Sequence, residues 1–201
     1  MSRQSLQRAY TLWAPIYDLA VRGFSAPLRQ RSLSGIPAGP CRILVDGIGT
    51  GLDIPYLPKH GEIVGIDITH AMLRHARKQD AEITLAQADA ETLPFPDARF
   101  DIVVMHLILA VVPHADTALA EASRVLRPGG RILLIDKFLR RGQHAFWRRL
   151  LTPVSSAIAT HTSLVFEEIL ERRPELHLIS DIPTAISGWF RLITLEKSAQ
   201  R

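Results

Sequence analysis

The stretch ILVDGIGTG at residues 43–51 decides the fold of this chain. Its first three residues form an apolar run that is typical of a short buried strand. Glycine then occupies every second position from 47 to 51, where it lets the backbone turn sharply and approach a ligand without a side-chain clash. A tight structural turn would use the same glycines, so the loop alone indicates only a candidate site for a nucleotide-like ligand.

Beyond residue 41 the chain alternates between runs typical of strands and amphipathic segments typical of helices. Strands are predicted at 43–45, 62–68, 83–86, 101–105, 131–136, 176–182 and 189–196, and helices at 71–79, 116–126 and 162–173. Thr69 stands where it could cap the helix 71–79. The run 101–105 is apolar on both faces, as a central parallel strand should be. The pattern predicts a doubly wound, Rossmann-like α/β fold with a seven-stranded, mostly parallel sheet.

The first 40 residues have a different character. Arginines alternate with aromatic residues there, and Pro15 and Pro27 interrupt the segment, which predicts two or three short helices. The run GIPAGP at residues 35–40 then reads as a linker. We therefore divide the chain into an N-terminal helical segment, 1–40, and a main region, 41–201, within a single compact domain.

Composition limits the class of protein. With 201 residues, the chain is long enough to bury a sizeable core. Cys41 is the only cysteine, so no intrachain disulfide can form. We find neither a secretory signal nor an apolar run long enough to span a membrane, which predicts a cytoplasmic enzyme. The net charge of +4 permits an anionic partner, such as a membrane surface, without requiring one.

An acidic residue ends the second predicted strand. Asp67, in the run GIDI at residues 65–68, could accept hydrogen bonds from both hydroxyls of a ribose, although it could also merely cap the next turn. The glycine spacing argues against a dinucleotide, because Leu52 stands where the third glycine of that motif would be. Pro55 and Pro58 allow only a short helix after the loop, which disfavours a pyrophosphate. These features favour an adenosine ligand without phosphate.

These elements together resemble the class I S-adenosylmethionine (SAM)-dependent methyltransferases. The resemblance rests on residues 43–51, the run GIDI at 65–68, the run QADAETLPF at 87–95 and the turn RVLRPGGR at 124–131. It spans residues 41–136 in order. Within the family it points to the group that contains ubiquinone/menaquinone methyltransferases and bacterial phosphatidylethanolamine N-methyltransferases. SAM is therefore the expected cofactor.

The resemblance also implies roles for particular residues. The methionine part of SAM would lie against the glycine loop, the ribose on Asp67, the adenine between two apolar side chains and beside a second acid, and the transferring methyl near a histidine. The glycine loop is Gly47, Gly49 and Gly51, and the two apolar side chains are Ile68 and Met72. The second acid is Asp89, with the backbone of Ala90 nearby, and the histidine is His106. Ile68 and Met72 could equally be core residues.

One departure from the family concerns its first motif. The family places an acidic residue two positions before the first glycine, where this chain has Val45, and Asp46 stands one position later. Neighbouring side chains of a strand point to opposite faces, so Asp46 cannot be assumed to contact the methionine amino group. Asp53, in the following loop, is an alternative for that contact.

The resemblance further assigns residues to the acceptor side. The run WAPIYD at residues 13–18 is similar to the segment that opens the quinone and phospholipid enzymes, where it folds over the cofactor as a lid. Residues 1–40 would then form the lid of a SAM-binding domain at 41–201. Tyr17 would contact SAM or substrate, and Tyr10 would also lie on the substrate side. Lys137 is a further candidate on that side because it follows a predicted strand near the transferring methyl. His106, Tyr17 or the post-strand pair Asp136 and Lys137 could supply a catalytic base, or His106 could only shape the pocket.

The expected acceptor is a small or lipid-like molecule. N-methylation of a phospholipid amine, O-, S- or C-methylation of a hydrophobic metabolite, and SAM binding without catalysis all remain open. Arginines and aromatic residues alternate at 138–161, which suits peripheral contact with a membrane and equally a solvated helix face. We expect no nucleic-acid partner. We expect no metal either, because His70 and His75 are five apart and do not share a helix face. The sequence does not indicate an oligomeric state.

Overall fold

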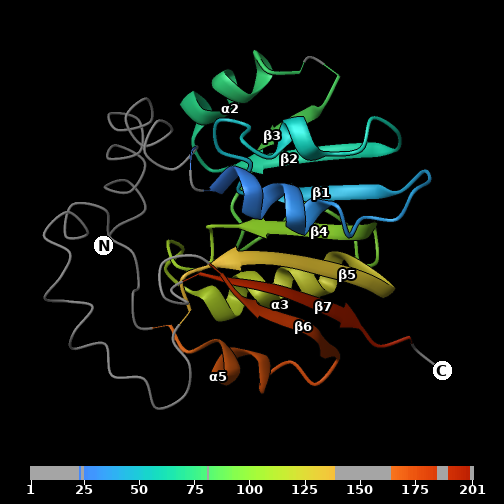
Figure 1. The fold of residues 1–201 in the computed structure, drawn as a ribbon, viewed down its shortest axis with the longest axis vertical. Helices are drawn as coiled ribbons and strands as arrows, with labels where there is room; N and C mark the ends of the chain where they lie inside the picture. The colour runs from blue at the N-terminus through green and yellow to red at the C-terminus, as the bar shows by residue number, and fades with distance from the viewer. Residues whose placement is uncertain (1–22, 24, 81, 139–163, 185–189, 200–201) are drawn as a thin grey trace, which may run out of the picture.

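A seven-stranded sheet forms the centre of the protein in a computed structural model that describes residues 23, 25–80, 82–138, 164–184 and 190–199. The strands lie in the order β3-β2-β1-β4-β5-β7-β6 (Figure 1). Their bounds are β1 Arg42–Asp46, β2 Glu62–Asp67, β3 Thr84–Gln87, β4 Phe100–His106, β5 Leu126–Asp136, β6 Leu176–Pro183 and β7 Arg191–Lys197. Strands β1 to β5 are parallel, and β7 runs antiparallel to both β5 and β6. The predicted doubly wound, mostly parallel sheet is confirmed.

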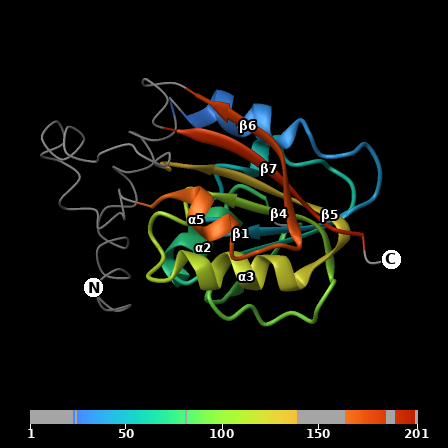
Figure 2. The same cartoon turned by 90° about the horizontal axis from the view of Figure 1, so that it is seen from below.

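Helices cover both faces of this sheet. The assigned helices are α2 His70–Arg77, α3 Ala115–Val125, α5 Phe166–Leu170 and the short 3-10 helix η1 Ile54–Tyr56. Residues 25–33 are also helical. Figure 2 shows the helix at 25–33 and α3 on opposite sides of the sheet. Leu33 packs with α2 on one face, and α3 and α5 pack on the other.

The alternation of β4 explains why the sheet sits between two apolar layers. Val103 and Met105 are fully buried on the α3 side, whereas Ile102 and Val104 are buried on the side of the helix at 25–33. Burying one such side chain contributes about 1.5–3 kcal/mol. A strand that is apolar at every position from Ile102 to Met105 therefore becomes a central strand covered on both faces, as its sequence predicts.

Several boundaries differ from those predicted. Strand β5 begins at Leu126 rather than at residue 131, because the run RPGG joins the strand across a register irregularity opposite β4. Helix α5 covers only Phe166–Leu170 of the predicted 162–173, of which 162 and 163 lie outside the described residues. Thr69 is the N-cap residue of α2, but its side chain makes no capping hydrogen bond.

The chain order of the strands fixes where a ligand can bind. From β1 the chain proceeds outward to β2 and β3, and then returns to place β4 on the other side of β1. The carboxyl ends of all five parallel strands meet at one edge of the sheet. A crevice opens at such an edge where the strand order reverses. The loops after β1, β2, β3 and β4 are therefore expected to surround a site.

Candidate functional site

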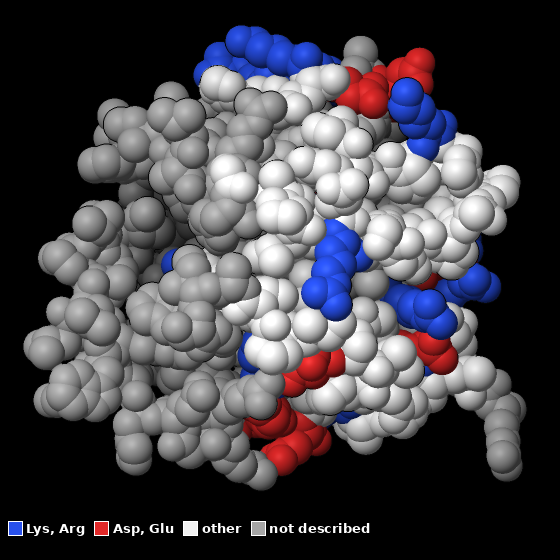
Figure 3. Space-filling view, viewed as in Figure 1, with Lys and Arg blue, Asp and Glu red and all other residues white. Residues whose placement is uncertain are grey.

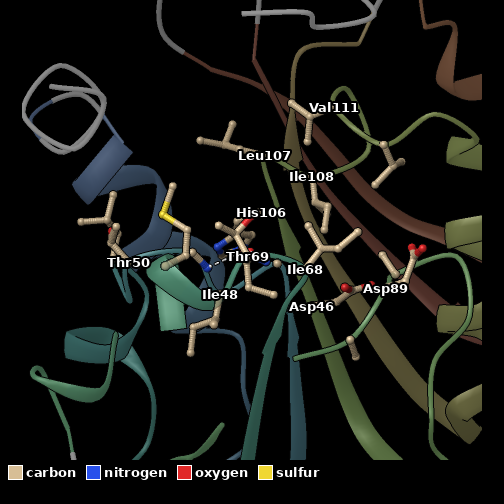
Figure 4. Close-up of a pocket in the computed structure, with 18 of the residues that line it drawn as sticks. Asp46, Ile48, Thr50, Ile68, Thr69, Asp89, His106, Leu107, Ile108 and Val111 are labelled. Atoms are coloured by element: carbon tan, nitrogen blue, oxygen red, sulfur yellow. Dashed lines mark hydrogen bonds between the residues drawn. The ribbon is translucent and has the colours of Figure 1, made fainter. Parts of the chain in front are cut away.

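A cavity lies at this edge, between the loops that follow β1, β2, β3 and β4 (Figure 4). Among its lining residues are eight that were predicted to bind the cofactor: Gly47, Gly49, Asp67, Ile68, Met72, Asp89, Ala90 and His106. Gly51 and Lys137 do not line it. Tyr10 and Tyr17 lie outside the described residues, as do residues 139–161 of the basic and aromatic segment.

The glycine loop has a backbone that only glycine adopts readily. Gly47 has a φ of +76°, and a Cβ atom there would lie 2.5 Å from Cδ1 of Ile108. Gly49 has a φ of +56° and opens onto the cavity. Gly51, at +92°, packs against Ala76 of α2, with only 3.1 Å between a built Cβ and the Ala76 Cα. Gly51 therefore packs the loop on α2 and does not line the cavity, and its contact with the cofactor stays a prediction.

Asp67 is held in place by two backbone amides. The N–H of Gly49 donates to Oδ2 at 3.0 Å, and the N–H of Thr69 donates to Oδ1 at 2.8 Å. Burial raises the pKa of Asp67, and the hydrogen bonds from these two amides and from the Thr69 side chain oppose the rise. An ionised carboxylate accepts about four hydrogen bonds, so Asp67 keeps acceptor capacity for a ligand hydroxyl.

A buried polar network lies beneath the other end of the cavity. Nδ1 of His106 is 2.6 Å from Oδ1 of Asp53, and Nε2 is 2.9 Å from the hydroxyl of Ser32. Asp53 also pairs with Arg29, whose Nε donates to Ser25. Although burial alone would raise the pKa of Asp53, His106 and Arg29 hold it well below its usual range. The network ties the helix at 25–33 to the end of β4.

This network changes what His106 can do. Both ring nitrogens of His106 are engaged within the protein, Nδ1 with Asp53 and Nε2 with Ser32. His106 still lines the cavity, as expected. The geometry supports its role in shaping the pocket over its alternative role as a base.

The two candidate acids beside the loop behave differently from each other. Asp53 is committed to Arg29 and His106 and does not line the cavity. Asp46 does line it, while Val45 points the other way into the core. The carboxylate of Asp46 is buried and accepts no hydrogen bond from the described residues. Burial, with Asp67 and Asp89 nearby, raises its pKa to about 8.

An apolar wall closes the cavity on the side of β4. It is formed by the loop after the strand, through Leu107, Ile108, Val111, Val112 and Pro113. The loop begins at a left-handed residue, since φ is +62° at Leu107. Oδ2 of the buried Asp136 accepts the N–H of Ala110 at 2.9 Å and so fixes the loop, and burial raises the pKa of Asp136 to about 6. Lys137 instead stacks over Phe190, with Nζ 5.5 Å from the ring centre.

Sequence reasoning did not single out Arg29 or the wall residues Leu107 and Ile108. Arg29 and its partner Asp53 are distant in the chain, and no local pattern joins them. The position of Leu107 and Ile108 directly after β4 is a usable signal, because lining residues follow each of the strands β1 to β4. Figure 3 shows the described Lys and Arg side chains spread over one face rather than gathered in a patch.

Known methyltransferases are similar to this chain in sequence. A family model described as a methyltransferase domain matches residues 44–134. A phosphatidylethanolamine N-methyltransferase of Cereibacter sphaeroides is 30% identical, over 98% of this chain and 100% of that protein. This chain belongs to the SAM-dependent methyltransferases. A ubiquinone/menaquinone biosynthesis C-methyltransferase of Pseudomonas fluorescens is 39% identical to this chain. The match covers 52% of this chain and 44% of the Pseudomonas protein.

Solved structures agree on the fold of this methyltransferase. A putative methyltransferase in complex with the Haloferax volcanii Trm112 activator has a TM-score of 0.76 at 18% identity, covering 98% of each chain. A possible histamine N-methyltransferase of Thermotoga maritima has a TM-score of 0.72 at 19% identity, covering 95% of this chain and 99% of that one. At these identities the likeness shows the fold alone.

The cavity suits SAM, the cofactor of this family. A nucleoside with a charged amino-acid tail can use three features of the cavity. These are the crowded glycine loop, the carboxyl group of Asp67 and the buried acid Asp46, which has no hydrogen-bond partner among the described residues. Within the described ranges, no group of three His, Cys, Asp or Glu is placed to hold a metal ion. Among the same residues, no helix is both long and apolar enough to cross a membrane.

Proposed function

We propose that this methyltransferase transfers the methyl group of SAM to the amine of a phospholipid headgroup. The observation that carries the proposal is the end-to-end match to the phosphatidylethanolamine N-methyltransferase, which covers 98% of this chain and all of the relative. The match to the Pseudomonas fluorescens quinone C-methyltransferase covers only 44% of that relative. The apolar wall at 107–113 supports an acceptor with hydrocarbon beside its reactive group.

In this proposal the cofactor lies across the carboxyl ends of β1 to β4. Gly47 and Gly49 allow close approach of the methionine part, and Asp67 accepts the ribose hydroxyls. Asp89, whose Oδ1 already accepts the N–H of Glu91, lies with Ala90 at the adenine end. Ile68 and Met72 flank the ring. Arg29, a cation in the lining, faces the carboxylate of the methionine part.

SAM supplies an electrophilic methyl on a sulfonium, so the protein's task is mainly alignment. The loop at 107–113 positions the acceptor, and Asp136 keeps that loop in place through the N–H of Ala110. An acceptor amine that arrives as an ammonium ion must lose one proton before it attacks. His106 has both ring nitrogens engaged, so we assign it to positioning and retain Tyr17 as the candidate base. Tyr10 and Lys137 remain candidates for contact with the headgroup.

The acceptor is tested with methyl-labelled SAM and three acceptor preparations. These are vesicles that contain phosphatidylethanolamine, vesicles of phosphatidylcholine alone, and a detergent-dispersed demethylated quinol. We expect label in mono- and dimethylated phosphatidylethanolamine and none in the quinol. Label in the quinol with an unmodified lipid would contradict the proposal and favour C-methylation. Sedimentation of the protein with anionic vesicles tests peripheral membrane contact separately.

A further inference from the structure

We propose that Asp46 is the counter-ion for the positive charge of SAM, and that it gives up a proton when SAM binds. The inference rests on the proposal that the cavity is the SAM site. In that proposal Asp67 binds the ribose and Asp89 lies at the adenine end, so the nucleoside part of SAM leaves Asp46 without a role. Asp46 also departs from the family pattern, in which the acid stands at the position of Val45.

The geometry of Asp46 is unusual for a carboxyl group. The residue is 1% exposed at the end of β1, and neither side-chain oxygen has a hydrogen-bond partner among the described residues. It nevertheless forms part of the cavity wall, on the side where Asp89 lies (Figure 4). A buried polar group without a partner is costly, and native proteins seldom keep one unless a ligand or another function uses it. Asp46 therefore points to a group that enters the cavity.

The charges around Asp46 define what that group is. Asp67, at the end of β2, and Asp89, after β3, both disfavour its ionisation. The cation Arg29 and the imidazole of His106 also line the cavity, but both are committed to Asp53. In the free protein, Asp46 is therefore largely a neutral acid, with a pKa of about 8. A carboxyl in such a place ionises when a cation arrives beside it.

SAM and S-adenosylhomocysteine both carry an α-ammonium group, but only SAM also brings a sulfonium cation. The sulfonium gives SAM one more positive charge than the product, which is a neutral thioether. Binding can be written as protonated Asp46 plus SAM giving ionised Asp46 with bound SAM and one released proton. Methyl transfer removes the sulfonium charge, so Asp46 takes a proton back from solvent. The carboxyl would thus favour SAM over its product and assist exchange of the spent cofactor.

Calorimetry can count the proton. SAM is titrated into the wild-type protein near pH 7 in two buffers with different heats of ionisation, and the difference gives the protons released. We expect close to one proton for SAM in the wild type, and an affinity that rises about tenfold per pH unit between roughly pH 6 and pH 8. S-adenosylhomocysteine should release a smaller fraction. Asp46→Asn should abolish the Asp46-dependent release and flatten the pH dependence.

Controls separate Asp46 from other sources of protons. The α-amino group of SAM titrates in the same range. The proton release assigned to Asp46 is therefore the number of protons released by the wild type minus the number released by Asp46→Asn with the same ligand. Asp97→Asn, at an exposed acid outside the cavity, should behave as the wild type. Equal proton release by the wild type and Asp46→Asn would overturn the inference.

A measurement on the wild type alone guards against a variant that folds poorly. Infrared difference spectra should show the C=O band of a protonated carboxyl in the free protein and its loss when SAM is added. Persistence of that band with SAM bound would overturn the inference. Neither experiment involves an acceptor, so their outcome is independent of whether a phospholipid is methylated. Failure of the wild type to bind SAM would instead overturn the assignment of the site.

Discussion

Asp53 joins His106 to Arg29: one carboxylate oxygen lies 2.6 Å from Nδ1 of the imidazole, and the other pairs with the guanidinium. All three side chains are buried. The arrangement links the loop after β1, the end of β4 and the helix at 25–33. A segment that precedes the sheet in the chain thereby becomes part of the cavity wall, since both Arg29 and His106 line it.

Replacing Asp53 with Asn should destabilise the protein strongly. The change leaves the Arg29 charge buried without its partner, which costs on the order of 3–5 kcal/mol. Because the pKa of Asp53 is lowered in the folded state, its contribution is present above the unfolded pKa of about 4 and is lost as the pH falls through the folded value. Urea unfolding near pH 7 and near pH 3 measures both effects. A loss no larger than that of Asp97→Asn at pH 7 would contradict the role of the network.

Replacing Asp46 with Asn should have the opposite effect on the protein without ligand. The pKa of Asp46 is raised to about 8 in the folded state. Its stabilising effect is therefore complete below about pH 4 and declines as the pH rises toward 8. Asn has no charge to bury, so the variant should unfold at a higher temperature than the wild type at pH 8, with a smaller gain at pH 5. Thermal unfolding at the two values checks this, and a gain independent of pH would argue against the raised pKa.

Replacing Gly47 with Ala should damage both the loop and the ligand site. The new Cβ would lie 2.5 Å from Ile108 at a φ of +76°, so Ile108 or the loop must move. We expect a loss of about 1–3 kcal/mol in stability from this overpacking and at least tenfold weaker SAM binding by calorimetry. Gly49→Ala is the matched control, because its nearest atom is 4.0 Å away. Equal stability losses in the two variants would show that the positive φ, rather than the contact with Ile108, causes the loss.

Replacing Val111 with Thr tests the apolar wall. The two side chains have the same shape, but Thr brings a hydroxyl to a surface that we assign to the hydrocarbon part of the acceptor. We expect the KM for phosphatidylethanolamine vesicles to rise severalfold, while the Kd for SAM stays unchanged. Steady-state kinetics and calorimetry provide the two numbers. A changed Kd for SAM with an unchanged KM would place the cofactor, rather than the acceptor, against this wall.

Periodicity alone predicted much of this fold. The run 101–105 is apolar at each residue apart from Asp101, and β4 is indeed covered on both faces. Residues at or just beyond the ends of parallel strands, such as Asp67 and Asp89, came together because the topology brings the carboxyl ends of these strands to one edge. Boundaries were less predictable where backbone geometry overrode residue type, as in the run RPGG that joins β5.

The features of the site that could not be predicted from the sequence depend on tertiary packing. Nothing near Arg29 indicates that it will pair with Asp53, since the contact exists only once a helix has docked on the sheet. The spacing of Gly51 suits the ligand loop, but its neighbour in the structure is Ala76 of α2. Strand alternation showed that Asp46 and Val45 face opposite ways. It could not show that Asp46 reaches the cavity while Asp53 is held away from it.

The claim that the cavity between β1 and β4 holds SAM is tested most directly by a crystal structure with S-adenosylhomocysteine bound. We predict that the ribose hydroxyls donate to the two oxygens of Asp67, that the adenine lies by Asp89 and that the amino-acid tail crosses Gly47 and Gly49 toward Arg29. A ligand bound elsewhere on the protein, or one bound here with its ribose away from Asp67, would contradict the account.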